Sequence, residues 1–249
     1  MTLSYLKKDF CREWILFNRE KKDSAKILPQ QEKLAVRVGQ GLLSPFIEVW
    51  IPTKKCFVIG KYYAKKLEKA GKMEELKKSK IPFVLRSSGG EVILHDSTCL
   101  CIAVALPADF FASSFPLSDA FLLFSTGITA FLKKIKITAS FGKTKSFCPG
   151  AYDLVAGKKK IMGNSLLFQR KFCLIHGTLL VNSKEEYFEK LKFFYPDIHK
   201  EATSLSLLAG INFNMEEVIE GIIKGYMEKL SITILPHSPG RNHFLCIIP

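Results

Sequence analysis

The stretch CLCIAVAL, residues 99–106, most restricts what this chain can fold into. Eight consecutive residues are apolar, which predicts a strand that is buried on both of its faces. The sheet that contains such a strand must be covered on both sides, so this segment predicts the centre of a layered domain.

Further strands are predicted around this one, at residues 48–52, 56–60, 83–88, 91–96 and 171–181, with a hairpin over 151–163 that turns at Ala156 and Gly157. Helix signals flank the strands. They predict a lysine-rich helix after residue 60 with Tyr63, Leu67 and Ala70 inside, and helices capped by Ser118, Ser183 and Asn214 that end near Lys134, Phe194 and Lys229. We therefore expect an α+β fold, a mixed or antiparallel sheet flanked by helices, as a single domain over residues 1–249.

The net charge of +14, from 37 Lys and Arg against 23 Asp and Glu, favours an acidic partner or serves only solubility. Nucleic acid is not expected, because the chain has no helix-turn-helix signature, no aromatic RNP run and no zinc knuckle. No membrane association is expected either, because no apolar run reaches about 18 residues. The first residues lack the apolar stretch of a secretory signal, so we expect a cytoplasmic protein.

The cysteines are seven in number and scattered, at Cys11, Cys56, Cys99, Cys101, Cys148, Cys173 and Cys246. No pair has CxxC spacing. The pattern argues against a disulfide framework or a structural zinc site and predicts reduced thiols.

Three short groups of residues are candidates for chemistry. In RSSGG, residues 86–90, the two glycines allow a ligand close to the backbone, and Arg86 can clamp a phosphate or carboxylate. In KIMGNS, residues 160–165, Lys160 can neutralise a carboxylate that reacts with a phosphate. In HGTLL, His176 and Gly177 interrupt a buried strand. Each group also has a plain structural interpretation: a glycine-containing connection, a basic hairpin tip, and a core histidine.

The order of these groups resembles the biotin/lipoate protein ligase family, and most of all its lipoate–protein ligases. The family pattern is an Arg-x-x-Gly-Gly loop, an Asp-Leu before Lys-x-x-Gly-Asn, and His-Gly-Thr-Leu-Leu. Here these are residues 86–90, Asp153 with Leu154, residues 160–164 and residues 176–180. CFVIGKYY resembles an early Val-x-Gly segment that places Gly60 near the ligand.

The resemblance implies the catalytic-domain fold of that family and an ATP-dependent reaction. Lipoate or octanoate is activated with ATP and Mg²⁺ as an acyl-adenylate, and a lysine of a lipoyl domain then takes the acyl group. Lys160 would be catalytic, contacting the acyl carbonyl and the phosphate, and Asp153 would position Mg²⁺ or the incoming lysine. The implied substrate-binding and adenylate-binding residues are Gly60, Arg86, Ser87, Ser88, Gly89, Gly90, Asp153, Gly163, Asn164, His176, Gly177 and Thr178.

The implied acceptors are lipoyl domains of 2-oxoacid dehydrogenase subunits or the glycine-cleavage carrier protein. The chain departs from the family pattern at Glu91, where many relatives have a third glycine, and at Tyr152, where ligases often have Asn or Thr. We expect no accessory C-terminal domain, so adenylation would require a separate accessory ligase subunit or would not occur.

Two alternatives remain open beside the ligase. FCPGAYDL resembles the amidotransferase branch of the family, where a cysteine shortly before Asp-Leu is the nucleophile, and Cys148 fits that position. The protein would then move octanoyl or lipoyl groups between carrier proteins without ATP. In the other alternative it binds lipoyl domains without catalysis, its site being degenerate at Glu91.

Overall fold

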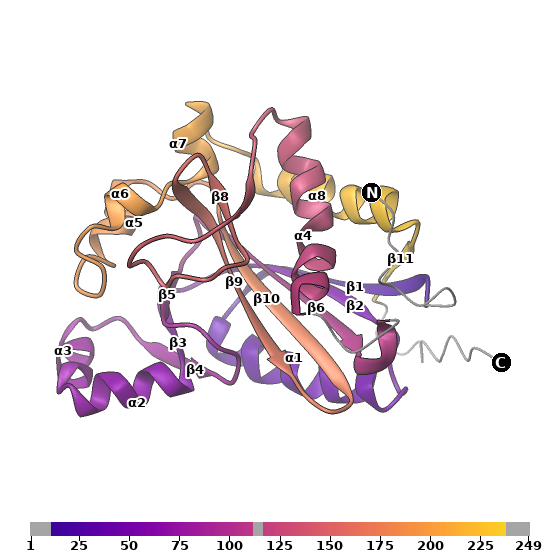
Figure 1. The fold of residues 1–249 in the computed structure, drawn as a ribbon, viewed down its shortest axis with the longest axis horizontal. Coiled ribbons are helices and arrows are strands. Elements are labelled where there is room, and N and C mark those ends of the chain that lie inside the picture. The colour runs from indigo at the N-terminus through magenta and orange to yellow at the C-terminus, as the bar shows by residue number, and fades with distance from the viewer. Residues whose placement is uncertain (1–10, 112–116, 238–249) are drawn as a thin grey trace.

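The computed structural model describes residues 11–111 and 117–237 (Figure 1). A mixed eight-stranded sheet forms its centre, because β1 is parallel to both of its neighbours while the other neighbouring strands are antiparallel. In spatial order its strands are β11 (Thr233–Pro236), β1 (Glu13–Lys22), β2 (Phe46–Pro52), β6 (Cys99–Pro107), β10 (Phe172–Leu180), β9 (Lys159–Phe168), β8 (Asp153–Ala156) and β7 (Ser140–Gly142).

A second, three-stranded sheet lies against one face of the central sheet. Its order is β4 (Phe83–Arg86), β3 (Cys56–Gly60) and β5 (Val92–His95), with β3 parallel to β4 and antiparallel to β5. The helices are α1 (Ser24–Gly39), α2 (Lys61–Lys69), α3 (Lys72–Lys78), α4 (Leu117–Lys134), α5 (Glu185–Glu189), α6 (Ile198–Glu201), α7 (Leu205–Ala209) and α8 (Met215–Leu230), with a 3₁₀ turn at Ala108–Phe110.

Strand β6 confirms the expectation of burial on both faces. Leu100, Ile102 and Val104 pack into a core that the residues of α4 and α8 close on one side of the sheet. Cys101 and Ala103 point to the opposite side and belong to a second core, formed with α1 and the small sheet. The predicted α+β class with a mixed sheet flanked by helices is confirmed (Figure 1).

Local signals predicted several elements well. Asn214 caps α8 by accepting a hydrogen bond from the backbone N–H of Glu216 at 2.9 Å, as the sequence predicts. The predicted hairpin is present as β8 and β9. Residues 48–52 and 56–60 are strands as expected, but they belong to different sheets and do not pair with each other.

Three details of the helix predictions were wrong. The lysine-rich helix is broken into α2 and α3 at Gly71, whose φ is +69°, and Ala70 is exposed. Ser118 lies inside α4, which begins at Leu117. Ser183 does not cap α5, because its hydroxyl hydrogen-bonds with that of Thr98 at 3.0 Å, and α5 ends at Glu189. Within the described residues, no helix is both long and apolar enough to cross a bilayer.

Candidate active site

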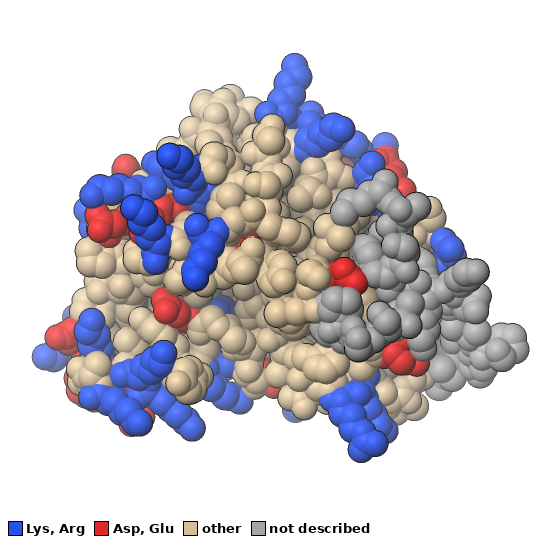
Figure 2. Space-filling model, viewed as in Figure 1, with Lys and Arg blue, Asp and Glu red and all other residues tan. Residues whose placement is uncertain are grey.

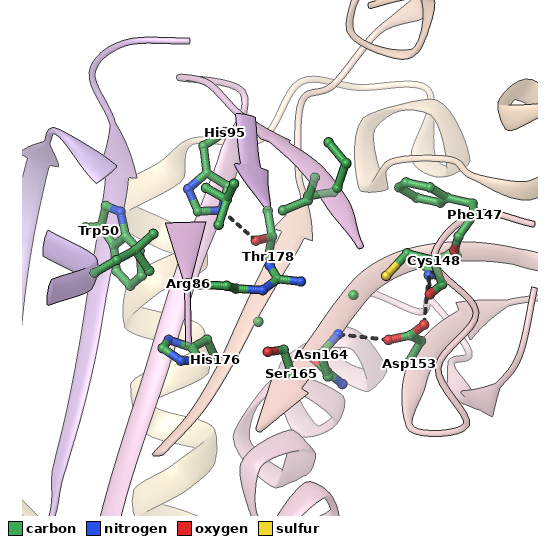
Figure 3. Close-up of a pocket in the computed structure, with 17 residues that line it drawn as sticks. Trp50, Arg86, His95, Phe147, Cys148, Asp153, Asn164, Ser165, His176 and Thr178 are labelled. Atoms are coloured by element: carbon green, nitrogen blue, oxygen red, sulfur yellow. Dashed lines mark hydrogen bonds and ion pairs between the residues drawn. The ribbon is translucent and has the colours of Figure 1, made fainter. Parts of the chain in front are cut away.

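The two sheets enclose a cavity into which most of the candidate residues point (Figure 3). The cavity is narrow, with about 40 Å³ of space open to the centre of a water molecule. The lining residues are Leu28, Trp50, Val58, Arg86, Val92, Ile93, His95, Phe147, Cys148, Asp153, Lys160, Gly163, Asn164, Ser165, His176, Gly177 and Thr178.

Lys160, on β9, is almost fully buried and its ammonium group is fully coordinated. Nζ lies 2.8 Å from Asp153 Oδ2, donates to the backbone oxygen of Cys148 at 2.7 Å, and also donates to the backbone oxygen of Phe147. An ammonium has three N–H donors, so none is left for a ligand. In this arrangement Lys160 ties the Cys148 loop to the hairpin and places a positive charge at the end of the cavity.

Asp153 begins β8 and is equally buried. Oδ1 accepts from the backbone N–H of Asn164 at 2.8 Å, and Oδ2 accepts from the backbone N–H of Gly150 at 3.0 Å. Burial raises the pKa of Asp153, while Lys160 and these hydrogen bonds oppose the rise. The carboxylate is thus held between a cation and two amides.

This coordination does not suit magnesium. Mg²⁺ requires several oxygen ligands in octahedral arrangement, and both oxygens of Asp153 are already engaged. The Lys160 ammonium, 2.8 Å from Oδ2, also places a positive charge that would repel a second cation at this carboxylate. The residues present do not fit the magnesium role predicted for Asp153.

Cys148 lies on the loop between β7 and β8 with a φ of +41°, a left-handed conformation that is rare outside glycine. Its sulfur points into the cavity (Figure 3) and accepts a hydrogen bond from the backbone N–H of Glu91 at 3.0 Å. Burial raises the pKa of the Cys148 thiol; Lys160, the Glu91 amide and Arg86 act in the opposite direction. The thiol is therefore protonated at rest but surrounded by groups that would stabilise a thiolate.

Arg86, at the end of β4, reaches across the middle of the cavity (Figure 3). Its Nε donates to the backbone oxygen of Gly89 at 3.0 Å. Gly90 makes room for it: a Cβ there would lie 2.4 Å from Arg86 Nη2 and 3.4 Å from Cys148 Sγ, and φ is +96°. Gly60 is needed in turn, since its Cβ would lie 2.2 Å from the backbone oxygen of Gly90.

The other end of the cavity contains two neutral histidines. His95 bonds to Ser24 and, at 3.0 Å, to Thr178, whereas His176 bonds to Gln31 at 3.2 Å through Nδ1. Burial, helped by the nearby charge of Arg86, lowers the pKa of each imidazole to about 3. The histidine at position 176 therefore carries no charge near neutral pH.

Residues 23–227 match the family described as the lipoyl protein ligase A/B catalytic domain. This chain is a member of that family. The resemblance drawn from the three motifs is confirmed.

Within this family, the chain is similar in sequence to octanoyltransferases and similar in fold to lipoate–protein ligases. It is 27% identical to the octanoyltransferase LipM of Geobacillus kaustophilus over 226 residues, 80% of each chain. The structure of a lipoate-protein ligase A bound with ATP has the same fold, with a TM-score of 0.72 and 17% identity, over 92% of this chain and 90% of that one. A chain from the archaeal lipoylation system of Thermoplasma acidophilum, a bi-partite lipoate protein ligase and its E2 lipoyl domain, matches with a TM-score of 0.67 and 15% identity, over 93% and 89%.

The structure brings some of the family's motif residues into the cavity lining, whereas others do not line it. Arg86, Cys148, Asp153, Lys160, Gly163, Asn164, His176, Gly177 and Thr178 line it. Gly60, Ser87, Ser88, Gly89 and Gly90 do not. Ser87, for example, bonds to Glu32 and to Lys61. The sequence indicated Glu91 only as a departure from the family pattern, and it predicted no role for the backbone amide of Glu91, for Trp50 or for His95.

Proposed function

We propose that this protein is an acyltransferase that moves an octanoyl or lipoyl group from a carrier thioester to a lysine of a lipoyl domain through Cys148. The observation that carries this proposal is the position of the Cys148 sulfur, inside the cavity, beside Arg86 and within hydrogen-bond distance of the Glu91 amide. The similarity to octanoyltransferases supports it.

In the first step the Cys148 sulfur attacks the carbonyl carbon of the acyl thioester. A carbon–sulfur bond forms to Cys148, the bond to the carrier sulfur breaks, and the proton of the Cys148 thiol passes to the leaving thiolate. One thioester replaces another, so the step is close to thermoneutral and needs no ATP.

In the second step a neutral lysine amine of the acceptor attacks the Cys148 thioester. A carbon–nitrogen bond forms, Cys148 leaves as a thiolate, and a proton lost by the amine restores the thiol. Both steps pass through a negative charge on oxygen and sulfur, and the fixed charges of Lys160 and Arg86 would stabilise it. Because all three donors of Lys160 are occupied, a direct contact with the substrate requires it to exchange one of them.

The ATP-dependent ligase, which the sequence alone favoured, has less support. The likeness to the ligase bound with ATP shows a common fold at 17% identity, and the Asp153 carboxylate is already engaged by Lys160 and two backbone amides. A cysteine placed as Cys148 is also unnecessary for an adenylate mechanism. The intact Lys160–Asp153 pair argues against a degenerate, non-catalytic site.

The partners that we propose are acidic carrier domains, acting in the cytoplasm. Lysines gather on the exposed surface of α2 and α3, at the lower left of the face in Figure 2. Complementary charge would speed the encounter with an acidic domain.

A transfer assay tests the proposal. Wild-type protein should move octanoyl from an acyl carrier to a lipoyl domain without ATP, and Cys148→Ser should abolish this transfer, because a serine hydroxyl is hardly ionised near neutral pH. Transfer that requires ATP and persists in Cys148→Ser would reject the proposal in favour of the ligase.

A further inference from the structure

Glu201, the last residue of α6, holds the loop that carries Cys148. Its Oε2 accepts from the backbone N–H groups of Ser146 and Phe147 at 2.7 and 3.0 Å, and its Oε1 accepts from the Ser146 hydroxyl at 2.7 Å. The side chain is 8% exposed. Three hydrogen bonds to one buried carboxylate thus fix the two residues that directly precede Cys148.

The segment that follows Glu201 also fixes Lys160. The backbone N–H of Thr203 donates to the backbone oxygen of Lys160 at 3.0 Å, and Lys160 and Ala202 form a parallel bridge. Lys160 in turn donates to the backbone oxygens of Phe147 and Cys148. Residues 201–203 therefore hold the Cys148 loop twice, directly through Glu201 and indirectly through Lys160.

The backbone of Cys148 needs such support. A non-glycine residue in the left-handed region is strained, and it keeps that conformation only when the surroundings impose it. If the loop relaxed, the sulfur would leave the Glu91 amide and the neighbourhood of Lys160 and Arg86.

We propose that Glu201 is a positioning residue for acyl transfer, which holds the Cys148 thiol in its reactive place by hydrogen-bonding the loop through residues 146 and 147. This inference rests on the proposed role of Cys148 as the acyl carrier. Glu201 does not line the cavity, so we infer that it acts through the loop alone.

The Glu201 carboxylate is ionised near neutral pH. Burial opposes its charge, but the hydrogen bonds from Ser146 and Phe147 outweigh burial and hold the pKa of Glu201 below its ordinary value. Because the pKa is depressed in the folded protein, the stability from these bonds is present near neutral pH and is lost only as the pH falls through that folded pKa.

Glu201→Ala removes all three bonds, while Glu201→Gln can keep them: the amide oxygen can accept the two backbone N–H groups, and the amide nitrogen can donate to the Ser146 hydroxyl. Glu189→Ala is the matched control. Glu189 lies on the neighbouring α5, where its carboxylate pairs with Lys192 and His199 at the exposed surface. Thermal unfolding checks that each variant is folded at the assay temperature.

Two rates are measured in each variant: single-turnover octanoylation of Cys148 by an octanoyl carrier thioester, and alkylation of Cys148 by iodoacetamide over a range of pH, followed by peptide mass spectrometry. Glu201→Ala should slow octanoylation by on the order of 10- to 10²-fold, the loss typical of a misplaced reacting group. Alkylation should become faster, because a released thiol is solvated and its pKa returns towards the ordinary value. Glu201→Gln and Glu189→Ala should stay within about threefold of wild type in both rates.

Unchanged rates in Glu201→Ala would overturn the inference. Equal loss in the Ala and Gln variants would overturn it as well, because the charge and not the hydrogen bonds would then matter. Failure of the proposed function would give another result: wild-type protein would form no octanoyl adduct on Cys148. The alkylation rates would still show whether Glu201 positions the Cys148 loop.

Discussion

Replacing Lys160 by methionine should destabilise the protein by about 3–5 kcal/mol, the cost of removing one partner of a buried ion pair. Both Lys160 and Asp153 are 2% exposed, and their charged atoms are 2.8 Å apart. Methionine fills much of the same volume, so the loss measures the uncompensated Asp153 carboxylate more than a cavity. Part of the variant will therefore be unfolded, so its transfer rate is divided by the concentration of folded protein before it is compared with that of wild type.

The loss of stability in Lys160→Met should depend on pH, because it arises from the ionised Asp153 carboxylate. Burial already raises the pKa of Asp153, and without Lys160 the pKa rises further. An acid whose folded pKa lies above its unfolded pKa destabilises the fold once the pH exceeds the unfolded value. The Lys160→Met penalty should therefore shrink towards pH 5, by up to about 1.4 kcal/mol per pH unit.

Urea unfolding at about pH 5 and pH 8 measures both effects. Lys158→Met, on the exposed turn of the same hairpin, should leave the unfolding free energy within about 0.5 kcal/mol of wild type. Adding Asp153→Asn to Lys160→Met should restore part of the loss, because no buried charge then remains. A Lys160→Met penalty that is small, or that is the same at both pH values, would refute this reasoning. In the folded fraction, transfer should fall by about 10²–10³ if Lys160 stabilises the developing charge.

Three further results are expected. Gly60→Ala should lower the melting temperature by several degrees, because its Cβ would meet the Gly90 backbone oxygen at 2.2 Å, whereas Gly89→Ala, with no atom within 4 Å, should not. Since the pKa values of His95 and His176 are about 3, NMR should show two imidazoles that stay neutral between pH 5 and 8; a midpoint in that range for either would contradict their burial. The rate of transfer to a lipoyl domain should fall as the salt concentration rises, and it should fall more than the rate of transfer to a small amine. Equal salt dependence of the two rates would argue against docking of the domain on the lysines of α2 and α3.

Local sequence signals predicted the parts of the fold that depend on neighbouring residues. Asn214 caps α8 through a bond two residues away, and the hairpin of β8 and β9 closes on itself. Ser183 has an equally good capping pattern, but its hydroxyl forms a hydrogen bond with the hydroxyl of Thr98, which is distant in the chain. The strand β1 and helix α1 were not predicted at all, although Asp23 caps α1 through its side chain.

In the candidate site, too, the sequence predicted residues but not the contacts between residues that are distant in the chain. The motifs identified Lys160 and Asp153, yet not that they pair with each other and leave no donor for a ligand. Glu201 lies in no motif, and its partner Ser146 is 55 positions away. The motif predicts Gly60 near the ligand, but it did not predict the close approach of Gly60 to the backbone of Gly90. Such contacts depend on how the sheets pack, which no local pattern encodes.

The central claim, that Cys148 carries the acyl group, is tested most directly by intact-protein mass spectrometry after mixing with an octanoyl carrier thioester in the absence of ATP. The account predicts a mass increase of one octanoyl group, located on the Cys148 peptide and absent from Cys148→Ala. The adduct should disappear when a lipoyl domain is added, as the domain gains the same mass. An unmodified wild-type protein that still octanoylates the lipoyl domain, or an adduct that the domain cannot remove, would contradict the account.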